Sequence, residues 1–372
     1  MHKISLFLII SAFYIFSSAQ TISPGKDKPI KYYGRDFFLI EGTTIADSLK
    51  ESPYDRLPLS YKDKVRKPVW NLSKSSAGIT VRFNSNSTSV KVKWELLNDY
   101  DMNHMAFTGI KGIDLYCKTD GQWRYVNTGR PTAKENEALL VSNMSAQMSE
   151  YKMYLPLYDG VIKLEVGIDS LSRIEKPLKS TKKPIVFYGT SITQGGCASR
   201  PGMVFSSIIS RKLDVECINF GFSGNGKMEP PIVEVISGID ASIYVIDCVA
   251  NMTLAEIHEN AIPLVEMIRE KHPAVPIVFV ESIYFEKSFL DDTTLNSTLG
   301  KNKALKMEYE KMMQRKFTNI FYTDTKDAIG SDHEGTVDSV HFTDLGFMRF
   351  ADFLISRFAE FKLIKTANKK PN

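Results

Sequence analysis

The sequence feature that most constrains the fold is a regular alternation of apolar runs and helical segments from about residue 184 onward. The apolar runs are nearly continuous, as parallel strands are when helices cover both faces of their sheet. Strand-helix-strand repetition of this kind predicts a doubly wound α/β domain with a parallel sheet. The expected strands are 185–188, 216–220, 243–248, 276–282 and 320–324, and the expected helices are 203–213, 255–272, 303–317 and 345–361.

The first part of the chain has a β pattern instead, in which apolar and polar residues alternate over short runs. These runs are 79–83, 90–94, 123–126 and 161–166. Closely spaced alternating strands predict an antiparallel β-sandwich of jelly-roll type. The charged, proline-containing segment 171–183 is interpreted as a linker. We therefore predict an N-terminal β-sandwich domain over 20–178 and an α/β domain over 179–372.

The N-terminus is typical of a secretory signal peptide. Lys3 precedes an apolar run from Ile4 to Phe16, and small residues follow it. We expect removal of residues 1–19 by cleavage after Ala19. Because the apolar run is short for a bilayer span, the mature protein is predicted to be exported, periplasmic or secreted, with no membrane insertion.

Charge and cysteine content narrow the possible functions. The formal net charge of +4 is small and evenly spread, so nucleic acid is not expected as a partner. Four cysteines are too few for a disulfide framework in a chain of 372 residues. Since there is no Cys-x-x-Cys pair and no run of histidines, we expect no metal site and no cofactor.

Chemically useful residues follow the ends of the predicted strands, where open α/β sheets form their sites. Ser191 follows the first strand, the glycine-rich segment 219–226 follows the second, and Asn251 follows the third. The last strand leads through a loop to Asp338 and His341. A serine hydroxyl needs a base to become a nucleophile, and a carboxylate three residues before a histidine can orient the imidazole.

An oxyanion also needs donors, which this arrangement can supply. We expect the backbone N–H groups of Ser191 and Gly224 and the side-chain amide of Asn251 to serve. Taken singly, each residue is better explained as a helix cap, a turn glycine or a surface histidine. Their order at successive strand ends favours a serine hydrolase.

These residues resemble the four sequence blocks of the SGNH/GDSL hydrolases. The matching residues are Gly189-Thr190-Ser191, Gly224, Asn251 and the pair Asp338 and His341, within about residues 183–362. The resemblance implies a flavodoxin-like sheet and ester hydrolysis. It makes Ser191 the nucleophile, His341 the base and Asp338 its support, with Gly224 and Asn251 completing the oxyanion hole.

The first part of the chain resembles the β-rich N-terminal domain of bacterial GDSL-type proteins, whose signature is Gly-x-Asp-Leu-Tyr. The signature here is 112-GIDLY-116, and the segments 54–58, 103–109 and 154–160 also fit. Three positions depart from the hydrolase pattern. Thr190 replaces the usual aspartate, 249-VA-250 replaces the usual glycine before the block-three asparagine, and Phe342 stands where proline often follows the histidine.

An exported hydrolase with a β-sandwich resembles carbohydrate esterases. We therefore predict removal of acetyl or another small acyl group from a glycan or a small-molecule ester. A lipid-directed esterase such as a lysophospholipase and a catalytically inactive glycan-binding protein are the alternatives.

Several residues outside the blocks have two interpretations. Arg200 is interpreted as a salt-bridge partner, with contact to an acidic sugar as the alternative. Tyr284 and Phe285 are assigned equally to loop packing and to a sugar-binding surface. His104 and Asp114 are expected to be structural.

Overall fold

The computed structural model describes residues 29–364 of the 372-residue chain. The signal peptide expected over residues 1–19 lies outside the described residues. Over the described range, none of the helices combines the length and apolar character needed to cross a bilayer.

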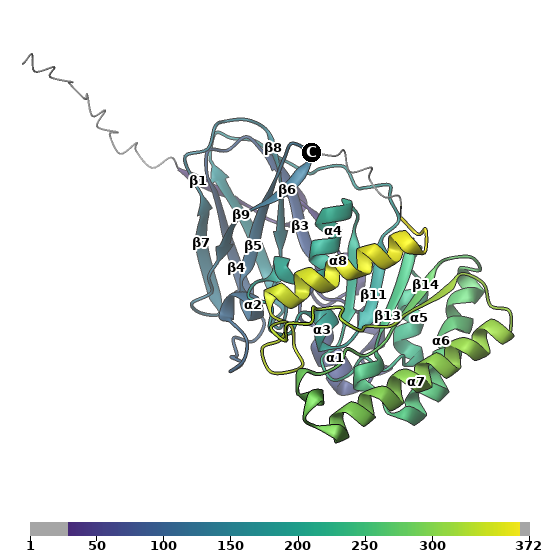
Figure 1. Cartoon of the computed structure of the whole chain (residues 1–372). Helices are drawn as coiled ribbons and strands as arrows, with labels where there is room; N and C mark the ends of the chain where they lie inside the picture. The colour runs from purple at the N-terminus through teal and green to yellow at the C-terminus, as the bar shows by residue number, and fades with distance from the viewer. Residues whose placement is uncertain (1–28, 365–372) are drawn as a thin grey trace, which may run out of the picture.

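An antiparallel β-sandwich forms the first part of the described chain (Figure 1). One sheet has the order β1-β9-β4-β7, and the other has the order β10-β3-β8-β5-β6 with β2 paired to β3. Inward-facing residues of both sheets, such as Val92 and Phe83, share one buried core. The strands are β1 (Ile30–Tyr33), β2 (Leu39–Glu41), β3 (Thr80–Ser85), β4 (Val90–Leu96), β5 (Ile113–Thr119), β6 (Gln122–Gly129), β7 (Glu135–Val141), β8 (Ser149–Tyr154), β9 (Val161–Asp169) and β10 (Ile174–Glu175).

A five-stranded parallel sheet forms the second part, in the order β12-β11-β13-β14-β15. Numbered along the chain this is 2-1-3-4-5, the flavodoxin-like order implied by the resemblance. Two buried clusters cover its faces, one built with α4 and α8 and the other with α5, α6 and α7 (Figure 1). The elements are β11 (Ile185–Gly189), β12 (Cys217–Gly221), β13 (Ile243–Asp247), β14 (Ile277–Val280), β15 (Ile320–Thr323), α3 (Ser191–Gln194), α4 (Phe205–Leu213), α5 (Pro230–Ser237), α6 (Leu254–Lys271), α7 (Asp292–Gln314) and α8 (Asp344–Glu360).

The expected fold class is confirmed, but several elements were not predicted. Helix α5 has only eight residues and begins with two prolines, so the apolar pattern extends over little more than two turns. Strands β5 and β8 lose the expected alternation because residues on both of their faces are buried. The expected linker is also partly wrong, since β10 lies within it and pairs with β3. Short helices complete the fold: α1 (Lys67–Ser73), α2 (Phe107–Lys111), η1 (Arg35–Phe37), η2 (Asp47–Leu49), η3 (Leu59–Tyr61), η4 (Pro201–Met203), η5 (Val249–Asn251) and η6 (Glu286–Phe289).

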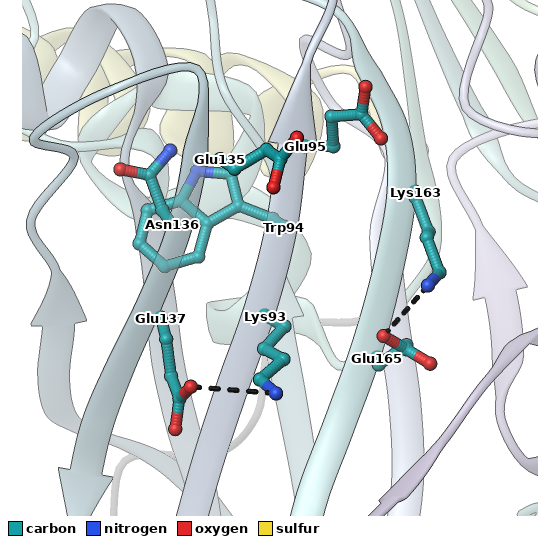
Figure 2. Close-up of a pocket in the computed structure, with 8 residues that line it drawn as sticks. All are labelled: Lys93, Trp94, Glu95, Glu135, Asn136, Glu137, Lys163 and Glu165. Carbon is teal, nitrogen blue, oxygen red and sulfur yellow. Dashed lines mark ion pairs between the residues drawn. The ribbon is translucent and has the colours of Figure 1, made fainter.

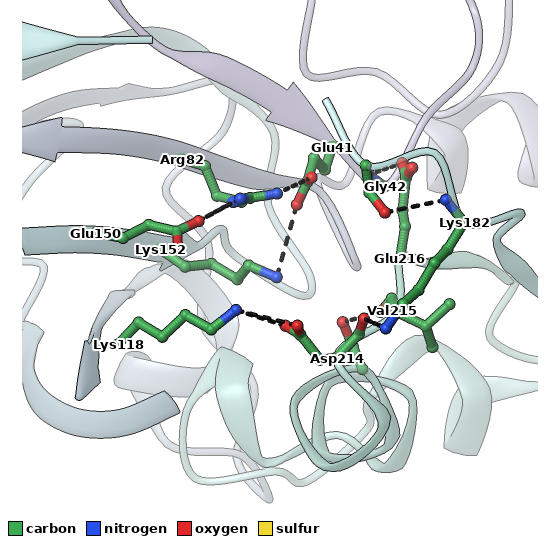
Figure 3. A network of polar contacts seen from close by, with 12 residues as sticks. Glu41, Gly42, Arg82, Lys118, Glu150, Lys152, Lys182, Asp214, Val215 and Glu216 are labelled. Carbon is green, nitrogen blue, oxygen red and sulfur yellow. Dashed lines mark hydrogen bonds and ion pairs between the residues drawn. The ribbon is translucent and has the colours of Figure 1, made fainter. Parts of the chain in front are cut away.

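Polar contacts join the sandwich to the parallel-sheet unit (Figure 3). The backbone N–H of Gly42 donates to Glu216 at 2.7 Å, and Lys118 lies 3.0 Å from Asp214. Apolar contacts add to this, because Trp70 of α1 packs into the buried cluster on the α5–α7 face. The sandwich therefore covers part of the α/β unit and can position residues near its sheet edge.

Candidate active site

Ser191 begins the short helix α3 just beyond the carboxyl end of β11. Thr190 is the helix N-cap, and its hydroxyl accepts a hydrogen bond from the N–H of Ile192 at 3.3 Å. Capping needs only a side-chain oxygen, so threonine can perform it in place of aspartate. The departure at Thr190 therefore leaves Ser191 at a capped helix start.

A continuous chain of contacts links Ser191, His341 and Asp338. The Ser191 Oγ lies 2.8 Å from Nε2 of His341, and Nδ1 of that ring lies 2.7 Å from Oδ2 of Asp338. Ser191 and His341 are 150 positions apart in the sequence. In this geometry one ring nitrogen can take the serine proton while the carboxylate fixes the tautomer through the other.

Asp338 is held as a carboxylate. Partial burial raises its pKa, but hydrogen bonds from the backbone N–H and the ring of His341 outweigh this and bring the pKa below the ordinary 3.8. Its Oδ1 accepts the N–H groups of His341 at 2.8 Å and Val340 at 3.1 Å. A carboxylate that remains ionised can stabilise an imidazolium formed beside it.

The loop that carries Asp338 and His341 is closed at its base. Thr336 and Phe342 pair in an antiparallel bridge, and the N–H of Val337 donates to the His341 carbonyl at 2.8 Å. Phe342 is fully buried, with its ring centroid 5.3 Å from that of Phe347. Here burial of an aromatic ring anchors the loop at the position where proline is often found.

An apolar cavity of about 540 Å³ adjoins the same loop. Ser339, between Asp338 and His341, accepts hydrogen bonds from the N–H groups of Glu286 at 2.9 Å and Lys287 at 2.8 Å. Glu286 also lines the cavity, together with Tyr284 and Phe285. These two aromatic residues therefore contribute to a cavity wall.

Three candidate oxyanion donors come from separate segments. Oδ1 of Asn251 accepts the N–H of Gly226 at 3.3 Å, so the amide nitrogen is the end left to donate. The backbone N–H groups of Ser191 and Gly224 have no acceptor within residues 29–364. The N–H of Ser223 donates to Gln194 at 3.0 Å, which holds the Gly224 turn against α3.

Gly224 and Gly226, both in the loop after β12, require glycine for different reasons. A Cβ on Gly224 would meet no atom within 4 Å, and its φ of 66° is what favours glycine there. A Cβ on Gly226 would overlap the carbonyl oxygen of Gly189, two residues before Ser191. The tight packing of this loop against β11 is therefore at Gly226, a residue that the sequence analysis did not single out.

Arg56 in 54-YDRLP-58 ties the N-terminal part of the chain to β12. It is buried, and burial lowers its pKa to about 9, so it remains charged at neutral pH. Its guanidinium lies 2.6 Å from the Gly221 carbonyl oxygen at the end of β12. In all it donates to four backbone carbonyls, those of Leu72, Ser75, Asn219 and Gly221.

Asp114 of the GIDLY signature holds the loop after α3. It is fully buried and accepts hydrogen bonds from Thr128 at 2.6 Å, from Arg200 at 2.8 Å and from the N–H of Gly202 at 2.8 Å. Burial raises the pKa of Asp114 although the Arg200 guanidinium lowers it. Arg200 therefore forms the expected salt bridge, and Asp114 has a structural contact with the α/β unit.

Two further N-terminal segments reach the nucleophile region. Leu157 accepts a hydrogen bond from the side chain of Gln194 at 3.1 Å, at the end of α3. His104 lies beside His341, with the two ring centroids 5.8 Å apart. Composition and spacing gave no signal for the proximity of His104, because it comes from a loop of the sandwich.

Four groups that could bind a metal ion meet here, which sequence spacing did not reveal. One potential ligand atom each of His104, Cys197, Asp338 and His341 lies within 4.8 Å of the others. Burial and the charge of Asp338 raise the pKa of the Cys197 thiol to about 12, so in the cluster as it stands this thiol is protonated at neutral pH. Asp338 and His341 are also engaged with each other, and we assign no metal to the cluster.

A separate hollow of about 550 Å³ lies over strands β4, β7 and β9 of the sandwich (Figure 2). Its two lysines each pair with a glutamate of the lining, Lys93 with Glu137 at 3.5 Å and Lys163 with Glu165 at 3.1 Å. Two lysines and four glutamates line the hollow, so its lining carries an excess of negative charge, and we assign no ligand to it.

Comparisons with known proteins identify the families that both parts of the chain match. Residues 182–358 match the model of the GDSL-like lipase/acylhydrolase family, and residues 30–174 match the GxDLY model of the N-terminus of SGNH-hydrolase-type esterases. A comparison with curated proteins found no match.

Solved structures share the fold over most of the chain. A crystal structure described as a GDSL-like lipase from Bacteroides ovatus is 33% identical, with a TM-score of 0.86, and the match covers 91% of this chain and 99% of that one. A salicylyl-acyltransferase from a tetracycline biosynthetic pathway is 16% identical, with a TM-score of 0.74 and coverage of 90% and 98%. A family two carbohydrate esterase from Cellvibrio japonicus is 12% identical, with a TM-score of 0.57 and coverage of 91% and 100%.

Proposed function

The chain belongs to the GDSL-like lipase/acylhydrolase family and is an ester-hydrolysing enzyme, and from this premise we propose that it removes acetyl or other small acyl groups from a carbohydrate. The observation that carries the chemical part of the proposal is the contact chain from Ser191 through His341 to Asp338, at 2.8 Å and 2.7 Å.

In the proposed acylation step, Ser191 Oγ attacks the ester carbonyl carbon while Nε2 of His341 takes its proton. The resulting imidazolium is stabilised by the Asp338 carboxylate. Collapse of the tetrahedral intermediate breaks the bond to the alcohol oxygen, which leaves with the proton from His341. Water then attacks the acyl-enzyme with His341 as base, which releases the acid and restores Ser191.

The oxyanion of each tetrahedral intermediate is assigned to three donors: the N–H groups of Ser191 and Gly224 and the amide nitrogen of Asn251. Their availability supports this assignment, since neither backbone N–H has an acceptor within the described chain and the Asn251 oxygen is already occupied by Gly226. Donors fixed before the reaction stabilise developing charge without reorganising.

A carbohydrate substrate is supported by the domain organisation and by the predicted export. The β-sandwich covers the α/β unit and contributes to its site region, and carbohydrate esterases of family two share the fold. We propose that residues 20–178 and 179–372 form the two domains of an exported protein after cleavage at Ala19.

A second candidate substrate is an ester with a longer acyl chain, including a lipid. The cavity of about 540 Å³ beside the Asp338–His341 loop favours it, because Phe289 and Leu295 line that cavity with Tyr284 and Phe285. An acyl chain placed there would remove apolar surface from water.

The test compares p-nitrophenyl acetate with p-nitrophenyl palmitate, followed by acetate release from acetylated polysaccharides. Ser191→Ala should lose at least about a thousandfold in kcat/KM. Ser142→Ala, at an exposed loop position of the sandwich, is the matched control and should retain wild-type rates. Preference for palmitate would favour the second candidate, and full activity of Ser191→Ala would refute the assigned nucleophile.

A further inference from the structure

His104 occupies a position beside the reacting groups that the mechanism above does not use. Both ring nitrogens of His341 are engaged, one with Ser191 and the other with Asp338. His104 therefore does not orient the base through a hydrogen bond. Its ring nevertheless lies 5.8 Å from that of His341, centroid to centroid, with the two planes inclined by 48°.

The loop that carries His104 is well anchored. Met105 is 6% exposed and packs in the buried cluster on the α8 face of the parallel sheet. Thr108, at the start of α2, donates its hydroxyl to the Ser199 carbonyl at 2.5 Å. Before His104, Asp101 pairs with Lys111 at 3.0 Å. Anchors on both sides give the imidazole a defined place at the site.

The hydrogen bond of His104 to its neighbour sets the chemistry that the ring offers. Nδ1 lies 3.1 Å from the amide oxygen of Asn103. An amide oxygen can only accept, so Nδ1 is the donor and carries the proton of the neutral ring. Nε2 is then an acceptor, and within residues 29–364 it has no hydrogen-bond partner.

The position of His104 selects the alcohol side of the ester. In acylation His341 must deliver its proton to the leaving oxygen, so the alcohol part of the substrate lies next to the His341 ring. Two of the three oxyanion donors, Gly224 and Asn251, come instead from the segments after β12 and β13. A group beside His341 therefore faces the alcohol, and an acceptor there suits a hydroxyl.

We propose that His104, supplied by the N-terminal β-sandwich, forms a subsite for a hydroxyl group adjacent to the scissile ester, by accepting its hydrogen bond on Nε2. This inference rests on the proposed Ser191 mechanism and extends it to the class of alcohol released. Sugars and other polyols carry such hydroxyls, whereas simple alkyl and aryl alcohols do not.

The test compares monoacetin with propyl acetate, which share a three-carbon alcohol and differ in its hydroxyls. The ratio of kcat/KM for the two esters is measured in the wild type, His104→Leu and His104→Gln, and p-nitrophenyl acetate is the hydroxyl-free reference. A hydrogen bond to the substrate should give wild type a preference for monoacetin about tenfold greater than that of His104→Leu. The intrinsic reactivity of the esters cancels in this comparison.

In the expected result, His104→Leu keeps its rate on p-nitrophenyl acetate within about threefold, and His104→Gln, which retains an acceptor, recovers part of the preference. Thermal unfolding midpoints verify that both variants are folded. An equal loss on all three esters, or an unchanged monoacetin preference, would overturn the subsite. Because neither ester contains a sugar, failure on acetylated polysaccharides would refute the carbohydrate assignment without deciding this one.

Discussion

The buried carboxylate of Asp114 should stabilise the packing of the sandwich against the loop that follows the nucleophile. It accepts three hydrogen bonds, two of them from Arg200 and Gly202 in the α/β unit. Asp114→Ala removes all three and leaves the Arg200 cation without its carboxylate. Loss of one partner of a buried pair costs about 3–5 kcal/mol. Arg200 is 20% exposed and partly rehydrates, so we expect about 3 kcal/mol.

Asp114→Asn separates charge from hydrogen-bond geometry. Its amide oxygen can still accept from Arg200 and Gly202, and its amide nitrogen can donate to the Thr128 hydroxyl. Only the charged contribution is lost, so the expected cost is about 1–2 kcal/mol. Asp352→Ala is the matched control because its ion pair with Lys212 is on the surface, and it should change stability by less than about 0.5 kcal/mol.

The assay is urea unfolding followed by tryptophan fluorescence and far-ultraviolet circular dichroism, whose coincidence tests two-state behaviour. Hydrolysis of p-nitrophenyl acetate is measured in parallel. We expect Asp114→Ala to lose about tenfold or more in kcat/KM because the loop after α3 shifts, and Asp114→Asn to stay within about threefold. Equal destabilisation of the two variants would refute this role of Asp114 in holding the sandwich to the loop. A free energy of unfolding for Asp114→Ala within about 1 kcal/mol of the wild-type value would also refute it.

Three other perturbations have defined outcomes. Asn251→Ala should lower kcat for p-nitrophenyl acetate about 100- to 1,000-fold with little change in KM, because an oxyanion donor acts in the transition state. A change confined to KM would contradict this donor role. Gly226→Ala should sharply reduce the yield of soluble, active enzyme because the new Cβ would overlap the Gly189 carbonyl oxygen. Gly224→Ala has open space around its Cβ and should lower the free energy of unfolding by only about 1–2 kcal/mol, because of its positive φ. Equal thermal unfolding midpoints for the two variants would contradict this difference in packing. Burial raises the pKa of Asp247 to about 7 despite its hydrogen bond from Thr193. The folded state therefore keeps a proton that the unfolded state releases near pH 4. As a result, the free energy of unfolding should fall by up to about 4 kcal/mol between about pH 4 and 7. Asp247→Asn should remove that fall, and parallel stability curves for both proteins over this range would argue against a buried titrating carboxyl.

Local patterns were sufficient to predict the class of fold. The apolar runs that became β11 to β14 are almost entirely buried, whereas β15 is buried only in part. The spacing of apolar residues identified α4, α6 and α8, but α7 begins at Asp292, well before the expected start at residue 303. Prediction was poorer where packing changes the local pattern. Strand β5 begins with the last four residues of the GIDLY signature but does not alternate, because the α/β unit covers its second face.

For the candidate site too, the sequence indicated the residues that lie in local motifs and missed those that are brought in by packing. The sequence indicated Ser191, Gly224, Asn251, Asp338 and His341 because each lies near the end of a predicted strand or in one short motif. It gave no indication that Arg56 would reach the carbonyl oxygens of β12 or that His104 would lie beside His341. Those contacts depend on how the sandwich packs against the α/β unit.

By itself, then, the sequence determined which chemical groups are present, the order of the elements that carry them and the family to which they are similar. Hydrophobic periodicity and strand-end motifs are local, and they persist in any arrangement of the elements. Only the tertiary structure decided which groups meet, bringing Ser191 within 2.8 Å of His341 across 150 positions and placing His104 next to His341. Such proximity is set by sheet order and by the burial of shared apolar surface between distant segments, which no short stretch of sequence encodes.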